Sequence, residues 1–282
     1  MTISSNTKPL AERLEKPNMT TLNEAKPRPP YRRNPEGFSV ARREAMAYRF
    51  IKKHHVVAML LHWFNAVVWL GELVTGAALV VADKYRFVPS RFNEILLGVF
   101  GSRAELLTLH IGIGVLWVAV LLIYGVFGFK TYFLNFLRND LVMDRDDLSW
   151  LKNKLRQILG LDYRLPEQDI YNAGQKCYAW VVVGTLGIAI TGFVMAFHLG
   201  PLWLIQWSIP VHFALVGAIV AGLVIHIYMG AILPEERPAF FSMLHGRVNE
   251  LYAYEHHTKW WRSYKEDERR LRDRLVEEEV RD

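Results

Sequence analysis

The sequence predicts an all-α membrane protein: a four-transmembrane-helix bundle with cytoplasmic tails and one helix on the membrane surface. The evidence is how apolar and charged residues are distributed. Of the 282 residues, 51% are hydrophobic and 22% are charged, yet the two kinds are segregated. Four long stretches are nearly free of charge, and the charged residues gather in the two tails and one loop. Such segregation is typical of a protein that crosses the membrane several times.

Four apolar segments define the predicted spans. They are expected at about Val56–Ala82, Leu106–Phe129, Cys177–Leu199 and Val211–Leu233. Each has about 23–27 residues, enough to cross a hydrocarbon core of about 30 Å as a helix that rises about 1.5 Å per residue. Backbone groups inside a bilayer must satisfy their hydrogen bonds within the segment, so these spans must be helices. The first fifty residues lack the apolar core of a cleavable signal, so the first span is expected to be an uncleaved signal-anchor.

Lys and Arg are distributed unequally between the two sides of the predicted membrane. The segment to His55, the loop 130–176 and the segment from residue 234 carry 30 of them, whereas loop 83–105 carries four and loop 200–210 carries none. Because positive residues gather on the cytoplasmic side, we expect both termini and the middle loop to be cytoplasmic. The predicted parts are a basic N-terminal cytoplasmic tail (1–54), a transmembrane domain (55–233) and a C-terminal cytoplasmic tail (234–282).

The middle loop contains a second helical pattern. Apolar residues recur there at helical spacing, with basic residues between them: Leu148, Leu151, Leu155 and Ile158. This pattern predicts a basic amphipathic helix on the inner membrane surface, and a cap packed on another subunit explains it equally well. The net charge of +6 suits anionic lipid headgroups, and no nucleic-acid-binding motif accompanies it. The one cysteine, Cys177, cannot build a metal–sulfur site alone, so a redox cofactor would need other ligands.

Four histidines lie inside the predicted spans: His62, His110, His212 and His226. An ionisable side chain in a bilayer is costly and usually faces the interior of the bundle. A single such histidine is more often a hydrogen-bonding helix contact than a ligand, but here the depths match in pairs. His62 and His226 lie roughly 9–11 Å from the inner boundary, at about 1.5 Å per residue. His110 and His212 both lie near the outer boundary.

The fourth span can contribute to both pairs. His212 and His226 are 14 residues apart, which places them roughly 40° apart on one face and about 21 Å apart along the helix axis. Two neutral imidazoles at each depth suit the axial positions of an electron-transfer haem. The sequence therefore predicts two b haems, an inner one on His62 and His226 and an outer one on His110 and His212. Zinc is disfavoured because it needs three or four ligands at one depth.

Two further polar residues in the spans have open interpretations. His198, at the outer end of the third span, is a rival outer ligand or an interfacial residue. Glu72, in the middle of the first span, is expected to be protonated or paired, and either bonds a neighbouring helix or serves a proton path. Glycines near the histidines could leave room for flat rings, although ordinary helix packing explains them nearly as well: Gly112, Gly114, Gly217 and Gly222.

The residues before the third span form a candidate quinone site at the inner surface. Asn172 and Gln175 are three residues apart and share a helix face. Their neutral amides can donate to a quinone carbonyl, and Gly174 would permit close approach of a ring beside His226. Asn and Gln at a helix start are otherwise usually caps. Cytoplasmic water, with an acidic residue of the preceding loop (Asp169 or Glu167), would supply protons.

Six motifs together resemble the gamma, cytochrome b subunit of respiratory membrane-bound formate dehydrogenase. The resemblance runs from about His62 to Tyr264. It is carried by LHWFNAVVWLGELVTG around His62, LHIGIGV around His110, YNAGQK at 171–176, VHFALVG around His212, VIHIYMG around His226 and EHHTKWWR at 255–262. The long N-terminal tail and the charge at Glu72 are not features of that family.

The resemblance implies a four-helix subunit of the bacterial inner membrane with two bis-histidine haems b. His110 and His212 would bind the outer haem and His62 and His226 the inner one, with a menaquinone or ubiquinone acceptor beside Asn172. It also implies an iron–sulfur beta subunit that feeds electrons to the outer haem and a molybdenum- or tungsten-pterin alpha subunit that oxidises formate. A trimer of such heterotrimers is an expected assembly, and formate oxidation itself would not occur on this chain.

Three other functions remain open on the sequence. The first is a cytochrome b anchor of another respiratory dehydrogenase, such as a hydrogenase or thiosulfate reductase, which keeps the haems and changes the electron donor. The second is a transporter whose histidines relay protons, and the third is a haem-free structural anchor. An absorption spectrum separates the haem proteins from the other two, because bis-histidine haem has sharp reduced α-bands.

Overall fold

The structure of the chain, a computed structural model, describes residues 34, 36–80, 88–134, 136–161 and 163–281. The contacts divide the chain into two compact units, residues 1–37 and residues 38–282. The elements and sites described here all lie in the second unit. Residues 1–33 of the predicted N-terminal tail, and the predicted end of the first span at Ala82, lie outside the described residues.

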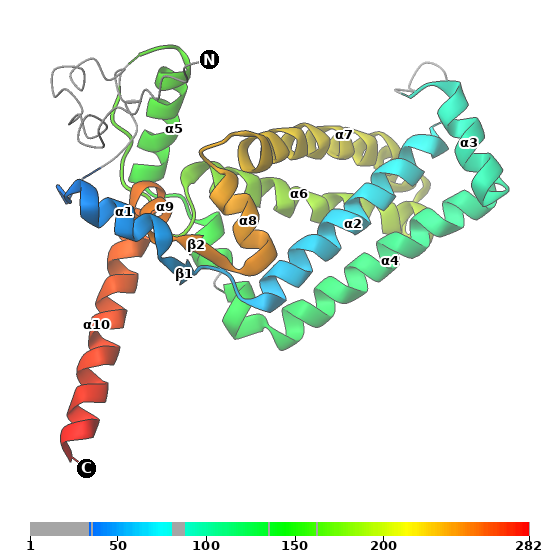
Figure 1. Ribbon diagram of the computed structural model, residues 1–282. Coiled ribbons are helices and arrows are strands. Elements are labelled where there is room, and N and C mark those ends of the chain that lie inside the picture. Colours follow the sequence, from blue (N-terminus) through cyan, green and yellow to red (C-terminus); the bar gives the residue numbers. More distant parts are fainter. Residues whose placement is uncertain (1–33, 35, 81–87, 135, 162, 282) are drawn as a thin grey trace, which may run out of the picture. The chain divides into compact units, whose positions relative to one another are not determined.

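The described residues form mainly helices, with one two-stranded sheet (Figure 1). Four helical segments are long and apolar enough to cross a membrane: α2 (Val56–Leu79), α4 (Arg103–Phe127), α6 (Ala173–Ala196) and α7 (Leu202–Ile227) with the π-helical turn that continues it to Ile232. The predicted all-α fold with four membrane-spanning helices is therefore confirmed. The other elements are α1 (Val40–Tyr48), β1 (Phe50–Lys52), α3 (Ser90–Phe100), two π-helical turns (Phe129–Phe133 and Phe136–Leu141), α5 (Arg145–Ile158), α8 (Arg237–His245), β2 (Arg247–Asn249), α9 (Glu250–His256) and α10 (Thr258–Arg281).

The four long helices pack in two pairs. The first pair is α2 with α4, and the second is α6 with α7. Helix α3 lies between α2 and α4 in sequence and contacts both of them, and α4 also contacts α6. The two helices of each pair run antiparallel (Figure 1).

The sequence at the start of two spans explains where these helices begin. At α4, the Ser102 side chain accepts from the backbone N–H of Glu105, and the Glu105 carboxylate accepts from the N–H of Ser102. At α6, Asn172 and Gln175 make the same reciprocal pair. Such capping boxes satisfy N–H groups that have no partner within the helix. The second and third spans therefore begin at Arg103 and Ala173, not at Leu106 and Cys177.

The predicted start of the fourth span was wrong. The helix begins at Leu202 and passes through Pro210 without ending, so most of the expected outer loop 200–210 is helical. Gln206, Ser208 and Pro210 interrupt the apolar run, which is why the sequence pattern suggested a later start. Transmembrane helices tolerate proline where other groups satisfy the freed backbone. His212 consequently lies ten residues inside its helix, about 15 Å from the start, not at its outer end.

The segment before the first span and the segment after the fourth span fold together into a terminal cap, defined here as residues 38–55 and 234–264. Strands β1 and β2 pair antiparallel, with Ile51 opposite Val248. Their buried side chains join a compact hydrophobic cluster: Met46, Ile51, Val248, Tyr252, Ala253, Tyr254 and Trp261. The segments expected to be cytoplasmic tails thus contain a small core that links the first and fourth spans.

Two helices outside the four spans, α5 and α10, have large exposed surfaces. Helix α5 confirms the helical pattern predicted for the middle loop, and its Leu148, Leu155 and Ile158 are exposed. It is attached to α6 by a buried ion pair between Asp147 and Lys176, with a 2.7 Å separation of Oδ2 and Nζ. Helix α10 is exposed along most of its length and projects away from the terminal cap, as Figure 1 shows.

Candidate functional site

His62 and His226 face each other across the first and fourth spans. Their ring centroids are 6.2 Å apart, with an angle of 58° between the ring planes. A metal–imidazole bond is about 2 Å long and the ring centroid lies about 1 Å beyond the nitrogen, so two imidazoles on opposite sides of one iron have centroids about 6 Å apart. The separation of His62 and His226 therefore fits a shared haem iron. The inner pairing proposed from helix depth is brought together by the fold.

Neighbouring aromatic rings fix the orientation of this inner pair. The phenol ring of Tyr178 stacks on the His226 imidazole, with centroids 4.1 Å apart and an angle of 12°. Trp63 contacts His62 edge to face at 5.4 Å, and its indole N–H donates to the carbonyl of Met243 at 2.8 Å. These contacts restrict the imidazole rotamers, as a ligand site requires.

His110 on α4 is held by α2. Its Nδ1 atom lies 2.6 Å from a carboxylate oxygen of Glu72 and 2.9 Å from the hydroxyl of Thr75. The ring also lies against Gly76, because a Cβ at that glycine would be 3.2 Å from Cε1 of His110. Helix α2 therefore provides two polar partners for the imidazole, and the missing Cβ of Gly76 provides space for its ring.

His212 on α7 is held by α6 in the same way. Its Nδ1 atom lies 3.0 Å from the carbonyl of Ile188 and 3.0 Å from the hydroxyl of Thr191. A Cβ at Gly192 would be 3.4 Å from Cε1 of His212. A Thr-Gly pair thus occurs in the first span and again in the third, and each pair receives the histidine of the helix packed against it. The sequence contains this repeated signal, but the predicted site did not include Thr75, Gly76, Thr191 or Gly192.

These contacts determine which ring nitrogen carries the proton. Each threonine hydroxyl donates to the carbonyl four residues earlier, Thr75 to Gly71 at 2.8 Å and Thr191 to Gly187 at 2.7 Å. Its oxygen is then left to accept a hydrogen bond from the histidine. With Nδ1 as the donor, Nε2 keeps its lone pair, which is the atom a haem iron needs. The donor chemistry of His110 and His212 therefore fits iron ligation.

His110 and His212 belong to one region of the bundle. His110 and Glu72 are both close enough to His212 to interact with it electrostatically. Because His212 and His226 lie on the same helix, 14 residues apart, the outer and inner regions are separated by about 21 Å along α7. Helix α7 thus carries one imidazole in each of these two regions.

The predicted glycines have different environments. A Cβ at Gly114 would lie 3.2 Å from Glu72 Oε1, and one at Gly222 would lie 3.1 Å from Val181, so these two glycines allow close helix packing. Gly112 and Gly217 face open space, with no atom within 4 Å of such a Cβ among the described residues. Only Gly112 and Gly217 therefore leave room of the kind expected for a flat ring.

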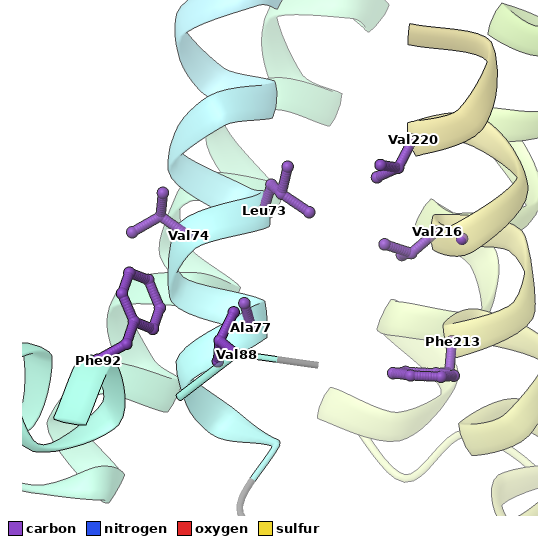
Figure 2. Close-up of a pocket in the computed structure, with 9 residues that line it drawn as sticks. Leu73, Val74, Ala77, Val88, Phe92, Phe213, Val216 and Val220 are labelled. Carbon is purple, nitrogen blue, oxygen red and sulfur yellow. The ribbon is translucent and has the colours of Figure 1, made fainter. Parts of the chain in front are cut away.

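An apolar pocket of about 450 Å³ opens between α2 and α7. Figure 2 shows Leu73 and Ala77 of α2 on one side and Phe213, Val216 and Val220 of α7 on the other. Phe213 directly follows His212 in the sequence, but none of the four histidines lines the pocket. Its size is in the range of small-molecule sites, and its apolar lining suits a hydrocarbon surface such as the edge of a macrocycle or a lipid chain.

The predicted quinone residues form the start of α6. The Asn172 side-chain oxygen accepts from the N–H of Gln175 at 2.9 Å, and the Gln175 side-chain oxygen accepts from the N–H of Asn172 at 2.9 Å. Gly174 faces Trp150, since a Cβ there would lie 3.8 Å from its ring. Asn172 and Gln175 therefore act as helix caps, which was the alternative to quinone binding that the sequence left open. Capping uses the oxygen of each amide, and each amide also has an NH₂ group able to donate.

The remaining candidates lie near the two ends of the spans. His198 is exposed in the turn after α6 and has a φ of 52°, in the left-handed region. Glu167 makes a two-point ion pair with Arg262, at 2.6 and 3.0 Å, and the Asp169 carboxylate accepts from the backbone N–H of Ile170 at 2.8 Å. No group of three or more metal-ligating His, Cys, Asp or Glu side chains occurs within the described ranges.

The fold and the supported imidazoles define a class of protein: a membrane protein that crosses the bilayer several times and is equipped to hold haem. The chain matches the family described as prokaryotic cytochrome b561 over residues 53–246, and it belongs to that family. Membership implies haem b as the cofactor. The match includes all four spans and all four histidines within them.

Curated relatives with similar sequences are cytochrome subunits. The nitrate-inducible formate dehydrogenase cytochrome b556(Fdn) subunit of Escherichia coli K12 is 23% identical over 141 residues, which cover 48% of this chain and 63% of that protein. The formate dehydrogenase cytochrome b556 subunit of Haemophilus influenzae is 22% identical over 217 residues, 75% of this chain and 82% of that protein. The chain thus spans a little under two thirds of the length of the E. coli relative.

Proposed function

We propose that this chain is the membrane cytochrome b subunit of a formate dehydrogenase complex and passes electrons from an iron–sulfur subunit to a membrane quinone. The observation that carries the proposal is the arrangement of four imidazoles in two regions about 21 Å apart along one helix. One region has ring centroids at a bis-histidine separation, and the other has Nδ1 atoms engaged by hydrogen-bond partners. Two one-electron sites at different depths divide electron transfer across the membrane into shorter steps than a single site would.

In this proposal His110 and His212 hold the outer haem iron, and His62 and His226 hold the inner one. Haem iron supplies reversible one-electron transfer. The protein supplies the position and the protonation state of each imidazole. Thr75 with Glu72, and Thr191 with the Ile188 carbonyl, keep the proton on Nδ1 and direct Nε2 toward the iron. The absence of a Cβ at Gly76 and Gly192 leaves space for the two imidazole rings.

The quinone site is assigned to Asn172, Gly174, Gln175 and His226. The amide NH₂ groups of Asn172 and Gln175 are donors for the quinone carbonyls, while their oxygens stay in the helix cap. His226 lies in the last turn of α7 and would bring the inner haem to the quinone. A quinone takes up two electrons and two protons, and cytoplasmic water supplies the protons in this arrangement.

The curated relatives are formate dehydrogenase cytochrome subunits by name, which supports a formate dehydrogenase complex as the assembly that contains this chain. We assign an iron–sulfur beta subunit to the outer haem and a molybdenum- or tungsten-pterin alpha subunit to formate oxidation. The chain resides in the bacterial inner membrane with both termini in the cytoplasm, on the basis of the charge distribution. We also propose that three such heterotrimers assemble into a trimer.

Purification of the tagged chain from its native membranes tests the proposal. Formate should reduce the haems of the complex, and a soluble quinone analogue should reoxidise them. Co-purification with the subunits of a hydrogenase or thiosulfate reductase, together with haem reduction by their substrates and not by formate, would reject the formate assignment. Absence of reoxidation by any quinone analogue would reject the acceptor.

Two substitutions at Asn172 separate quinone binding from helix capping. Asn172→Ser keeps an oxygen that can cap α6 but removes the NH₂ donor, whereas Asn172→Leu removes both. If the donor binds quinone, both variants should raise the quinone concentration needed for half-maximal reoxidation, while haem content stays at the wild-type level in the serine variant. Wild-type quinone kinetics in the serine variant would leave Asn172 as a cap alone.

A further inference from the structure

Lys53 and His257 form a buried pair in the terminal cap. Lys53 precedes α2 and is 9% exposed, and His257 follows α9 and is 0% exposed. The Lys53 Nζ atom lies 2.9 Å from Nε2 of His257. A buried lysine is rare unless it is paired with an anion, and here its hydrogen-bond partner is a second basic group.

The direction of this hydrogen bond is fixed by the other side of the imidazole. The Nδ1 atom of His257 lies 2.7 Å from the backbone carbonyl of Asp169. A carbonyl can only accept, so Nδ1 carries the proton and Nε2 has the lone pair. Lys53 therefore donates to His257, and His257 donates to Asp169. The three groups form a chain in which each proton points toward the Asp169 carbonyl.

Charged groups surround the pair on several elements. The Glu236 carboxylate before α8 accepts from the Tyr252 hydroxyl at 2.7 Å and lies 3.4 Å from Nδ1 of His256. Burial lowers the pKa of Lys53 to about 7, and Glu236 acts against that shift. Burial, with the nearby Lys53 charge, lowers the pKa of His257 well below its ordinary range.

Three other side chains lie near Lys53. Its ammonium lies 5.9 Å from the ring centroids of Tyr252 and Trp260. The pKa of His54 is lowered to about 3 by burial, with further contributions from the Lys53 and His62 charges. Near neutral pH, Lys53 can therefore both hold and release a proton.

The pair is attached to the segment that leads to the start of α6. Asp169 lies three residues before Asn172, and the Gln168 side chain accepts from the N–H of Ala173 at 2.7 Å. The backbone N–H of Lys259 donates to the Gln168 carbonyl at 3.1 Å. His257 and the candidate quinone amides are thus held to the same short stretch of chain, residues 168–173.

We propose that Lys53 and His257 form the proton relay for the quinone site at Asn172 and Gln175, an inference that rests on the proposed function. Conversion of one quinone to its quinol takes two electrons from the haem side and two protons. Each proton passes from the Lys53 ammonium to Nε2 of His257 as the Nδ1 proton leaves through water to the quinone oxygen, and His257 returns to its Nδ1-protonated form before the second proton passes. The neutral Lys53 amine then takes a proton from cytoplasmic water, on the side where Glu236 and His256 lie.

His257→Gln tests the relay with little change in geometry. The glutamine oxygen can accept from Lys53 and its NH₂ can donate to the Asp169 carbonyl, but an amide does not pass a proton. Lys53→Met is the second variant, and Lys52→Met, at an exposed neighbouring position, is the matched control. The measurement is stopped-flow reoxidation of formate-reduced haem by a soluble quinone analogue in the purified complex, between pH 6 and 9 and in H₂O and D₂O.

In wild-type complex the rate should fall as pH rises through about 7, where Lys53 loses its proton, and it should be slower in D₂O. His257→Gln and Lys53→Met should slow reoxidation by about 10²-fold or more, since a positioned proton-transfer group contributes about 10²–10⁴-fold. The absorption spectrum and the reduction of haem by formate should not change. Lys52→Met should match the wild type.

The outcomes separate the relay from the quinone function itself. If wild-type haem is not reoxidised by quinone at all, the proposed function fails. If wild type is reoxidised and folded His257→Gln or Lys53→Met matches its rate, the relay is wrong. If both variants lose their haems, the pH dependence of reoxidation in the wild type is the test instead. A wild-type rate that is independent of pH from 6 to 9 and shows no solvent isotope effect would also overturn the relay.

Discussion

The carboxylate of Glu72 on α2 and the imidazole of His110 on α4 form a 2.6 Å contact inside the bundle. The second carboxylate oxygen of Glu72 is buried and has no hydrogen-bond partner among the described residues. His212, the other outer imidazole, instead donates to the carbonyl of Ile188. The two proposed ligands of the outer haem thus differ in charge environment, and Glu72 supplies the difference.

Glu72→Gln should raise the midpoint potential of the outer haem. A carboxylate that accepts from Nδ1 makes the ligand more basic and stabilises ferric iron, so a neutral amide weakens this effect. A loss of about 1 kcal/mol corresponds to roughly 40 mV for a one-electron couple. A spectroscopic redox titration of the purified protein measures it. Glu94→Gln, at an exposed position on α3, is the control, and unchanged potentials for both haems in the Glu72 variant would contradict the assignment.

Gly76→Val should disturb the outer haem without affecting the inner one. A Cβ at residue 76 already lies 3.2 Å from the His110 ring, and the branched side chain of valine adds further atoms that must displace the imidazole. Haem quantification and the reduced spectrum should show loss or a spectral shift of one haem. The control is Gly125→Val on α4, where the Cβ meets no atom within 4 Å among the described residues. Two unchanged haems in the Gly76 variant would argue against His110 as a ligand.

Lys176→Met should destabilise the contact between α5 and α6. It leaves the buried Asp147 carboxylate without its cation, and removal of one partner of a buried ion pair costs about 3–5 kcal/mol. Asp147→Asn in the same chain should restore part of the stability, because the amide oxygen still caps the N–H of Asp144. Thermal unfolding of the detergent-solubilised protein measures both effects. Lys152→Met on the exposed side of α5 should have little effect, and an equally small effect of Lys176→Met would mean that the pair is solvated.

The predicted orientation can be tested with reporter fusions. A fluorescent reporter fused after residue 282 should fold and fluoresce in the cytoplasm, because positively charged segments stay inside. A periplasm-active phosphatase fused after Phe100, at the end of α3, should be active outside. The reverse pattern of the two reporters would invert the assignment of inner and outer haems.

The sequence predicted the four spans because their signal is local. An apolar run long enough to cross a bilayer must be helical, whatever its neighbours are. The pairing of His62 with His226 was also predictable, since helix geometry alone relates depth to residue number. The start of α7 was not, because Gln206, Ser208 and Pro210 weaken the apolar run although the helix continues through them.

The terminal cap could not be predicted from local patterns. It depends on the pairing of Phe50–Lys52 with Arg247–Asn249, two short strands nearly 200 residues apart in sequence. The EHHTKWWR run resembles a basic tail in composition, yet His257 and Thr258 are fully buried. Their roles depend on which distant residues lie against them, and those contacts come only from the folded chain.

The quinone residues show a different limit of sequence reasoning. Asn172 and Gln175 were correctly placed at the start of a helix on one face, and the structure gives their oxygens a capping role. A cap and a ligand site favour the same residue types at the same spacing. The sequence therefore could not separate the two, and the Asn172→Ser variant is needed to do so.

Two pairs of imidazoles that hold two haems in one chain should give a fixed cofactor stoichiometry. The most direct measurement is the haem b content per polypeptide of the purified chain, by pyridine haemochrome absorption and quantitative amino-acid analysis. We predict two haems in the wild type and one in His62→Ala. A chain that contains no haem, or a His62→Ala variant that retains both haems at full stoichiometry, would contradict the proposed ligation.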